Sequence, residues 1–199
     1  MIKLIIIYNW TFVKFLLEIL MYRGCNKTAL ASQRQIADAF VLLLKERPYP
    51  SISISQICKT AGVSRQTFYS LFESKENIIL YELSRKHHFI PGETCGKKAM
   101  DLKDLCQEYS SYIVEKKDFL SLLVRNDIIY LMHDCLCDSF SACSCFEPDR
   151  PDEYRSFMAE FLAGGLSAIA RNYIVQGGKL SASELNELIY AMFSGRMLR

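Results

Sequence analysis

The stretch Ala61-Gly62-Val63-Ser64-Arg65-Gln66-Thr67-Phe68-Tyr69 decides the fold of this 199-residue chain. Gly62 tolerates the positive φ that a sharp exit from a helix requires. Val63 is apolar and suits the angle between two helices, and Ser64 is a favoured N-cap for the next helix. The pattern therefore predicts a helix, a tight turn and a second short helix, which together form a helix-turn-helix. The apolar stripe expected on that second helix consists of Phe68, Leu71 and Phe72.

Further helices are expected on both sides of this stretch. Upstream, apolar residues recur at the i, i+3, i+4, i+7, i+8 spacing of an amphipathic helix. That helix ends before Pro48, because a proline disfavours helix in the residue before it. Ser53 is the expected N-cap of the following helix, and Ser74 that of a longer helix ending near Pro91-Gly92. The upstream stripe comprises Ile36, Ala39, Phe40, Leu43 and Leu44.

The second helix of the motif would present Arg65, Gln66 and Thr67 at its N-terminal end. An α-helix fits the DNA major groove, where Arg suits guanine O6/N7, Gln suits adenine, and Thr suits a phosphate or a thymine methyl. Tyr69 and Lys75 flank this helix and are candidate phosphate contacts. Taken alone, the Ala-Gly-Val-Ser string also fits a loop between packed helices.

The run from Ile36 to Ile79 resembles the N-terminal DNA-binding domain of the TetR/AcrR family of bacterial transcription regulators. The resemblance implies that Arg65 and Gln66 read bases, and that Ser64 begins the recognition helix. It implies phosphate contacts from Ser53, Thr67, Tyr69 and Lys75. Leu71 departs from the family pattern, which has His or Tyr there, and this removes one potential phosphate hydrogen bond. The residues that carry the match are Ile36, Ala39, Phe40, Ser53, Ile57, residues 61–64, residues 67–69, Phe72 and residues 74–76.

Charge is unevenly distributed along the chain. The net charge is only +2, but residues 27–90 carry nine basic and five acidic side chains, whereas residues 91–199 carry twelve basic and sixteen acidic ones. This asymmetry suggests an anionic partner at one end of the protein. Because 50% of the residues are hydrophobic, wholesale disorder is excluded.

Residues 91–199 are expected to form a second helical domain. A long helix is predicted over residues 152–175, ended by Gly177-Gly178, and a final helix follows with Ser181 and Glu184 as a capping box. These two helices resemble the dimer-forming helices of many family members, although both could instead close the core of the monomer. The predicted dimer interface comprises Phe161, Gly164, Gly165, Ala168, Leu188 and Met192.

The resemblance also implies an apolar pocket for a small-molecule effector in this second domain. Aromatic residues at helical spacing are more often ordinary core, so that alternative remains open. The candidate pocket-lining residues are Tyr109, Tyr112, Tyr130, His133, Phe157 and Phe161.

Eight cysteines in a chain of this length and apolar content indicate free thiols in a reducing cytosol. His133, Cys135-Leu136-Cys137 and Cys143-Ser144-Cys145 lie close in sequence and suggest a soft-metal or redox site. However, the spacing matches no common zinc pattern, and two cysteines in a helical Cys-x-Cys point to different faces. We therefore expect no metal or cofactor.

The segment 1–25 is an apolar N-terminal extension interrupted by Lys14 and Glu18. Three interpretations remain open: a non-native start that precedes Met21, an additional helix laid on the body, or a membrane anchor. The charges make a spanning helix costly, so no membrane association is expected. The segment also lacks the cleavage site of a signal peptide.

These observations predict an all-α protein with a three-helix DNA-binding domain at residues 26–90 and a helical ligand-binding and dimerisation domain at residues 91–199. P-loop, Gly-x-Ser-x-Gly and His-Glu-x-x-His motifs are missing, so no enzymatic activity is expected. We predict a cytoplasmic, homodimeric repressor that binds a palindromic DNA operator and is released by a small-molecule effector. The alternatives are a protein-interaction module that activates or inhibits a partner protein, and a cysteine-based metal or redox sensor.

Overall fold

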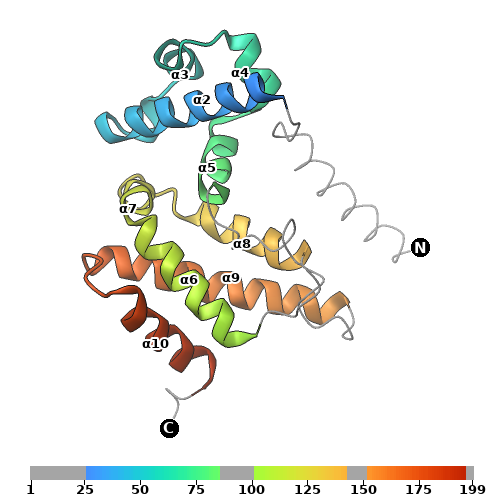
Figure 1. The fold of residues 1–199 in the computed structure, drawn as a ribbon, viewed down its shortest axis with the longest axis vertical. Coiled ribbons are helices and arrows are strands. Elements are labelled where there is room, and N and C mark those ends of the chain that lie inside the picture. The colour runs from blue at the N-terminus through green and yellow to red at the C-terminus, as the bar shows by residue number, and fades with distance from the viewer. Residues whose placement is uncertain (1–25, 86–100, 143–151, 196–199) are drawn as a thin grey trace. The chain divides into compact units, whose positions relative to one another are not determined.

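The computed structural model describes residues 26–85, 101–142 and 152–195. Within these ranges the chain forms nine α-helices and one short 3₁₀ helix, and no β-strand (Figure 1). It divides into two compact units, Met1–Glu82 and Leu83–Arg199. The all-α fold expected from the sequence is therefore confirmed.

The first unit is built on helix α2, Lys27–Glu46, which packs against the helices that follow it. Its elements after α2 are η1 (Tyr49–Ser51), α3 (Ile54–Ala61), α4 (Arg65–Leu71) and α5 (Lys75–Ser84), the last of which continues into the second unit. Ile36, Phe40 and Leu44 from the predicted stripe of α2 are buried. Burial of such side chains contributes about 1.5–3 kcal/mol each, which ties the short helices to α2.

Local signals place the starts of α3, α4 and α5 and the end of α3 as the sequence predicted. Helix α5 ends at Ser84, earlier than the expected end near Pro91-Gly92, and those two residues lie outside the described residues. The Ser53 hydroxyl caps α3 in a reciprocal capping box with Gln56, and the Ser64 hydroxyl accepts a hydrogen bond from the Thr67 amide at 2.9 Å. The Ser74 hydroxyl accepts from the Asn77 amide at the start of α5. Gly62 ends α3 with φ 69°, a left-handed conformation that L side chains rarely adopt.

The second unit contains α6 (Leu102–Glu115), α7 (Lys117–Arg125), α8 (Tyr130–Ala142), α9 (Asp152–Val175) and α10 (Ala182–Phe193). Helix α8 lies along α9, and α10 lies along α6 (Figure 1). Residues 119–136 are strongly apolar in sequence but belong to two helices, α7 and α8, because the chain turns between them at Asp127, whose φ is 56°.

The turn between α9 and α10 is also the one expected. Gly177 and Gly178 have φ values of 88° and 60°, and the Gly178 carbonyl accepts hydrogen bonds from Lys117 Nζ and the Tyr173 hydroxyl. Ser181 and Glu184 form the predicted capping box of α10.

The N-terminal extension 1–25 and residues Cys143 and Cys145 lie outside the described residues. Within the part of the chain that the structure describes, no helix is both long and apolar enough to cross a membrane.

Candidate nucleic-acid interface

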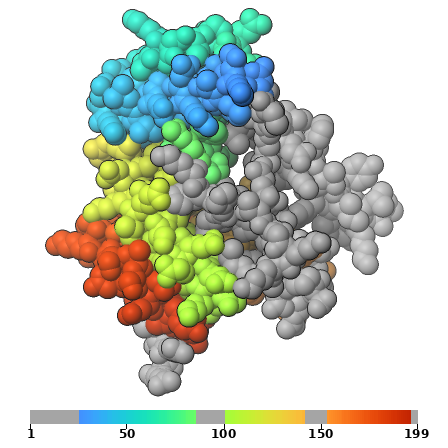
Figure 2. All heavy atoms as spheres, viewed as in Figure 1, coloured from blue at the N-terminus to red at the C-terminus, as the bar shows by residue number. Residues whose placement is uncertain are grey.

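Helix α4 has one face in the core and one face toward solvent. Phe68 and Leu71 are buried, and Phe72 is buried directly after the helix, whereas Arg65 and Gln66 are exposed. The Ser64 cap also joins its hydroxyl to the Thr67 hydroxyl at 2.8 Å. The buried residues hold the helix in place, so the position of its exposed N-terminal side chains is fixed as well. Figure 2 shows α3 and α4, in teal, at the surface.

Tyr69 extends this exposed surface along α4. Its side chain is 48% exposed, and its ring packs edge-on against Phe68 with the centroids 5.5 Å apart. The guanidinium carbon of Arg65 lies 6.0 Å from the centroid of the Tyr69 ring. This is the outer limit of a cation–π contact, which biases Arg65 toward an orientation over the ring. Arg65 and Tyr69 therefore form one continuous polar edge of α4.

Lys75 is less free than the sequence indicated. Its ammonium donates hydrogen bonds to the carbonyl oxygens of Tyr49 and Ile52, at 3.1 and 2.9 Å, and lies 4.2 Å from the centre of the Tyr49 ring. A lysine has three N–H donors, so one remains for a phosphate. Through these two hydrogen bonds Lys75 also holds the loop that leads into α3 against the start of α5.

Tyr49 is the residue of this surface that the sequence analysis missed. Its hydroxyl donates a hydrogen bond to the Glu76 carboxylate, and its ring packs edge-on against Phe40. Burial acts to raise the pKa of Glu76, but the hydrogen bonds from Tyr49, the Glu76 backbone and Ser74, together with the charge of Lys75, hold it below its ordinary value. The sequence signal that could have identified Tyr49 is its position between Pro48 and Pro50, because two prolines restrict the backbone of the loop.

The remaining predicted interface residues are distributed as follows. Ser53 is exposed, and its hydroxyl is engaged with Gln56 in the α3 capping box. Leu71, the departure from the family pattern, is buried in the core of the first unit. A leucine there contributes packing, and the polar edge of α4 is formed by other residues.

The six predicted pocket-lining residues fall into separate groups in the second unit. Tyr109 and Tyr112 are buried and stacked, and their hydroxyls donate to the carbonyls of Leu166 and Leu83. Burial raises the pKa of Tyr109 well above its ordinary range. The other four lie nearer the surface: Tyr130, Phe157 and Phe161 are exposed, and His133 is partly exposed.

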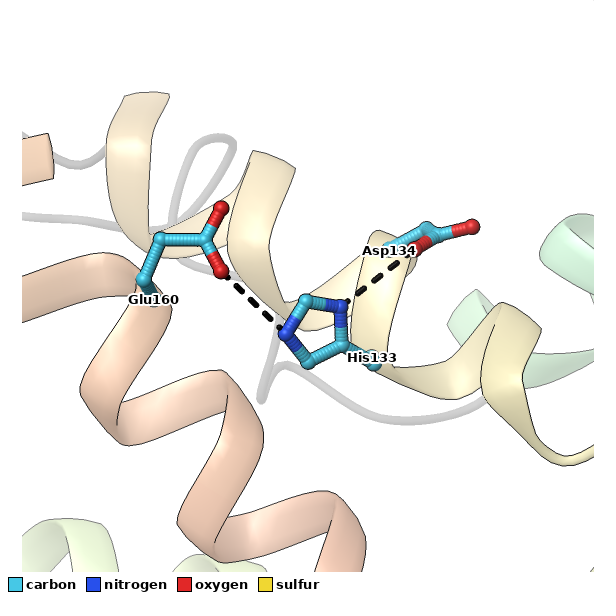
Figure 3. Close-up of polar contacts among 3 residues, drawn as sticks. All are labelled: His133, Asp134 and Glu160. Atoms are coloured by element: carbon cyan, nitrogen blue, oxygen red, sulfur yellow. Dashed lines mark hydrogen bonds and ion pairs between the residues drawn. The ribbon is translucent and has the colours of Figure 1, made fainter.

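His133 joins two helices through its ring nitrogens (Figure 3). Its Nε2 lies 3.4 Å from Glu160 on α9, and its Nδ1 lies 3.3 Å from Asp134 on its own helix.

The predicted dimer residues of α9 and α10 lie at or near the surface. Phe161 is 65% exposed, and its ring packs edge-on against Phe193 of α10 at 5.9 Å. Phe193 also covers Gly165, where an added Cβ would come within 3.0 Å of its ring. Beside Gly164 there is open space. The other three residues comprise exposed Ala168 and Met192 and partly exposed Leu188.

Cys135 and Cys137 are free thiols on α8. Burial, with nearby carboxylates, raises the pKa of Cys135 to about 12 and that of Cys137 to about 11. Both are therefore protonated near neutral pH, which weakens them as nucleophiles and metal ligands. Within the described ranges, no three His, Cys, Asp or Glu side chains are placed to hold a metal ion.

This geometry is that of a helix-turn-helix DNA-binding module attached to a helical body. Residues 36–81 match the family model described as "Bacterial regulatory proteins, tetR family". The dhaKLM operon transcriptional activator DhaS of Lactococcus lactis is 25% identical over 174 residues, which cover 77% of this chain and 85% of that protein. The regulator EthR of Mycobacterium tuberculosis is 49% identical over 43 residues, which cover 22% of this chain and 20% of EthR.

A solved TetR transcriptional regulator from Streptococcus agalactiae has the same fold. It superposes with a TM-score of 0.54 at 20% identity, covering 83% of this chain and 95% of that one. The matches to the family model and to the named regulators support a helix-turn-helix DNA-binding transcription regulator of the TetR family. The relatives matched by name are transcription regulators.

Proposed function

We propose that this protein binds a palindromic operator as a homodimer and represses transcription in the cytoplasm until a small molecule releases it. In this proposal residues 26–90 bind DNA, and residues 91–199 dimerise and bind the effector. The observation that carries it is the polarity of α4: Phe68 and Leu71 are buried, while Arg65 and Gln66 face solvent. A helix fixed from behind presents its N-terminal side chains to a major groove.

Each side chain of the surface has a proposed role on DNA. Arg65 donates to guanine O6 and N7, and Gln66 pairs with adenine. Ser53, Thr67, Tyr69 and Lys75 contact phosphates and fix the register of the helix, and Ser64 caps it. Lys75 uses its remaining N–H donor for this contact and keeps its two bonds to the loop.

A footprint on the DNA upstream of the protein's own gene tests the proposal. Arg65→Ala and Gln66→Ala should reduce discrimination between operator and random DNA, by about 1–3 kcal/mol for each lost base contact. Lys75→Ala should weaken both DNAs equally and reduce the salt slope by about one. Arg125→Ala, which removes the same charge from an exposed site in the other unit, is the matched control. Absence of any footprint would favour the protein-interaction alternative.

The homodimer is supported by the outer face of α9. Tyr154, Phe157 and Phe161 are between 58% and 78% exposed on a helix whose opposite side is buried. Exposed apolar patches of this kind mark interaction sites in soluble proteins. Two linked recognition helices can then read major grooves about 34–36 Å apart.

Sedimentation analysis of Phe161→Glu tests the dimer. The variant should be monomeric at concentrations where the wild type is dimeric, because a buried unpaired carboxylate is strongly unfavourable. Leu42→Glu changes a residue that is 50% exposed in the first unit and should leave the assembly unchanged. A monomeric wild type would refute the homodimer.

Activation is the second candidate for the sign of regulation, because the relative DhaS is named as a transcriptional activator. Transcript levels from the footprinted promoter decide between the two after deletion of the gene. An increase agrees with repression, and a decrease agrees with activation.

A further inference from the structure

The outer face of α9 is asymmetric along its length. Its N-terminal half carries large side chains, and its C-terminal half carries small ones. The large residues are Tyr154, Phe157, Met158 and Phe161, and the C-terminal half carries Gly164, Gly165, Ala168, Asn172 and Val175. Steps of three and four residues place all of them on one side of the helix. The opposite side, including Leu162, Leu166 and Tyr173, is buried in the second unit.

One edge of this face, which includes the contact of Glu160 with α8, carries opposite charges in its two halves. Glu160, in the half with large residues, contacts His133 of α8 (Figure 3), and its side chain is 62% exposed. Arg171, in the half with small residues, is exposed and has no ion-pair partner among the described residues. Eleven residues separate the two, which is close to three helical turns, so they share one edge about 16 Å apart. The other edge is bordered by Phe193 of α10.

We infer that α9 pairs with α9 of a second copy in antiparallel orientation, with the two-fold axis beside Gly165 and with Glu160 facing the partner's Arg171. This inference rests on the proposed homodimer and specifies its register. A two-fold axis perpendicular to both helices brings each edge of α9 against the same edge of its copy, in reverse order. The midpoint between positions 160 and 171 then lies at residues 165 and 166, where the large half has ended.

Size and charge favour the same arrangement independently. In antiparallel order, Phe161 packs over the partner's Ala168, and Phe157 packs near the partner's Val175. Open space beside Gly164 allows the backbones to approach at the crossing. A parallel pair would stack the large residues on each other and leave gaps between the small ones. Its two-fold axis would also place the edge that carries Glu160 and Arg171 against the opposite edge of the partner, so the two charges would not meet.

Cross-linking of the full-length protein tests the register. Glu160→Cys combined with Arg171→Cys should form a covalent dimer under mild oxidation, because the two thiols face each other across the pair. Either substitution alone should stay at the level of the wild type, whose native cysteines set the background. In the single variants the two introduced thiols are about 16 Å apart along the helix, which is beyond disulfide reach.

Charge reversal provides a second test that introduces no thiols. Arg171→Glu should weaken dimerisation about tenfold, because symmetry repeats the lost pair and adds two repulsions. Adding Glu160→Arg should restore the dissociation constant to within about threefold. Glu153→Arg, on the same edge but beyond the partner's helix end, is the matched control and should leave it unchanged. Circular-dichroism melting checks the folding of each variant.

The outcomes separate this register from the homodimer itself. A dimer that neither cross-links in the double cysteine variant nor recovers in the double charge reversal overturns the antiparallel register and leaves the proposed function standing. A wild type that stays monomeric overturns the homodimer and the register together. Cross-linking and recovery in the double variants alone support the register.

Discussion

Helices α4 and α9 differ in how they distribute apolar side chains. In α4 the large apolar residues Phe68 and Leu71 are buried, and the exposed positions are polar or carry the amphipathic Tyr69. In α9 one side is buried, and the other exposes Phe157 and Phe161. The first pattern suits hydrogen bonding to a polar, hydrated partner such as DNA. The second suits a partner that removes apolar surface from water.

The comparison shows that the exposed side chains of the two helices suit different kinds of partner. The exposed side chains of Arg65, Gln66 and Tyr69 on α4 each have a proposed partner on DNA, whereas the exposed phenylalanines of α9 lack a polar function and gain only from burial. Helix α4 therefore suits a polar partner, and helix α9 suits an apolar one.

Truncating a phenylalanine should have opposite consequences in the two helices. Phe68→Ala should lower the free energy of unfolding by about 3–5 kcal/mol, because Phe68 is completely buried. Phe157→Ala removes a side chain that is 78% exposed and should change the stability of the monomer by less than about 0.5 kcal/mol. Urea unfolding at several protein concentrations measures both and separates any contribution from dimerisation. Equal losses of unfolding free energy in the two variants at high dilution would contradict the proposed difference between α4 and α9.

Adding a methyl group at a glycine should also distinguish the units. Gly62→Ala should lower stability by about 1–2 kcal/mol, because φ at Gly62 is 69° and alanine is strained there. Gly164→Ala meets no neighbouring atom within 4 Å and should stabilise the helix by up to about 1 kcal/mol. The same change should weaken self-association, since the new methyl lies at the proposed crossing. Thermal melts with sedimentation measure the two effects, and tighter association would contradict the crossing.

The two capping boxes, at the starts of α3 and α10, both have a serine as the N-cap, so the same substitution can be compared in both units. Ser53→Ala and Ser181→Ala each remove a hydroxyl that caps a helix and should each destabilise the protein by about 1 kcal/mol. Of the two variants, only Ser53→Ala should also weaken binding to both operator and random DNA, because Ser53 is assigned to a phosphate and Ser181 is not. Urea unfolding and DNA titration of both variants provide the test. A matching loss of DNA affinity in Ser181→Ala would show that capping alone accounts for the effect.

The smallest effect is expected at the Tyr49 hydroxyl. Its hydrogen bond helps to hold the pKa of Glu76 below the ordinary value of 4.5, so it contributes stability above that pH and loses it as the pH falls through the lowered pKa. Tyr49→Phe should therefore lower stability by less than about 1 kcal/mol at pH 7, because Glu76 is partly solvated. The difference from the wild type should vanish in acid. Tyr130→Phe, at an exposed tyrosine, should show no such pH dependence when unfolding is followed from pH 7 to pH 3.

Much of the first unit could be predicted because its signals are local. A serine cap acts on the amide two or three residues later, and a left-handed glycine acts on its own backbone, so Ser53, Gly62 and Ser64 identify their turns without tertiary information. The same holds for Gly177 and for the capping box at Ser181. Spacing alone likewise placed the long helix at residues 152–175.

Other features depended on contacts distant in sequence. The role of Lys75 changed because its acceptors are the carbonyls of Tyr49 and Ile52, more than twenty residues away. Tyr109 and Phe161 are both aromatic residues at helical spacing, yet one is in the core and the other at the surface.

The sequence by itself therefore determined the helix caps, the glycine turns and the polar tip of α4. The tertiary structure decided which side of α9 is buried, and so which aromatic residues remain for a partner. The physical reason is range: a cap or a turn is fixed by atoms within one helical turn. A helix that is apolar on two sides can bury either of them until its neighbours are in place.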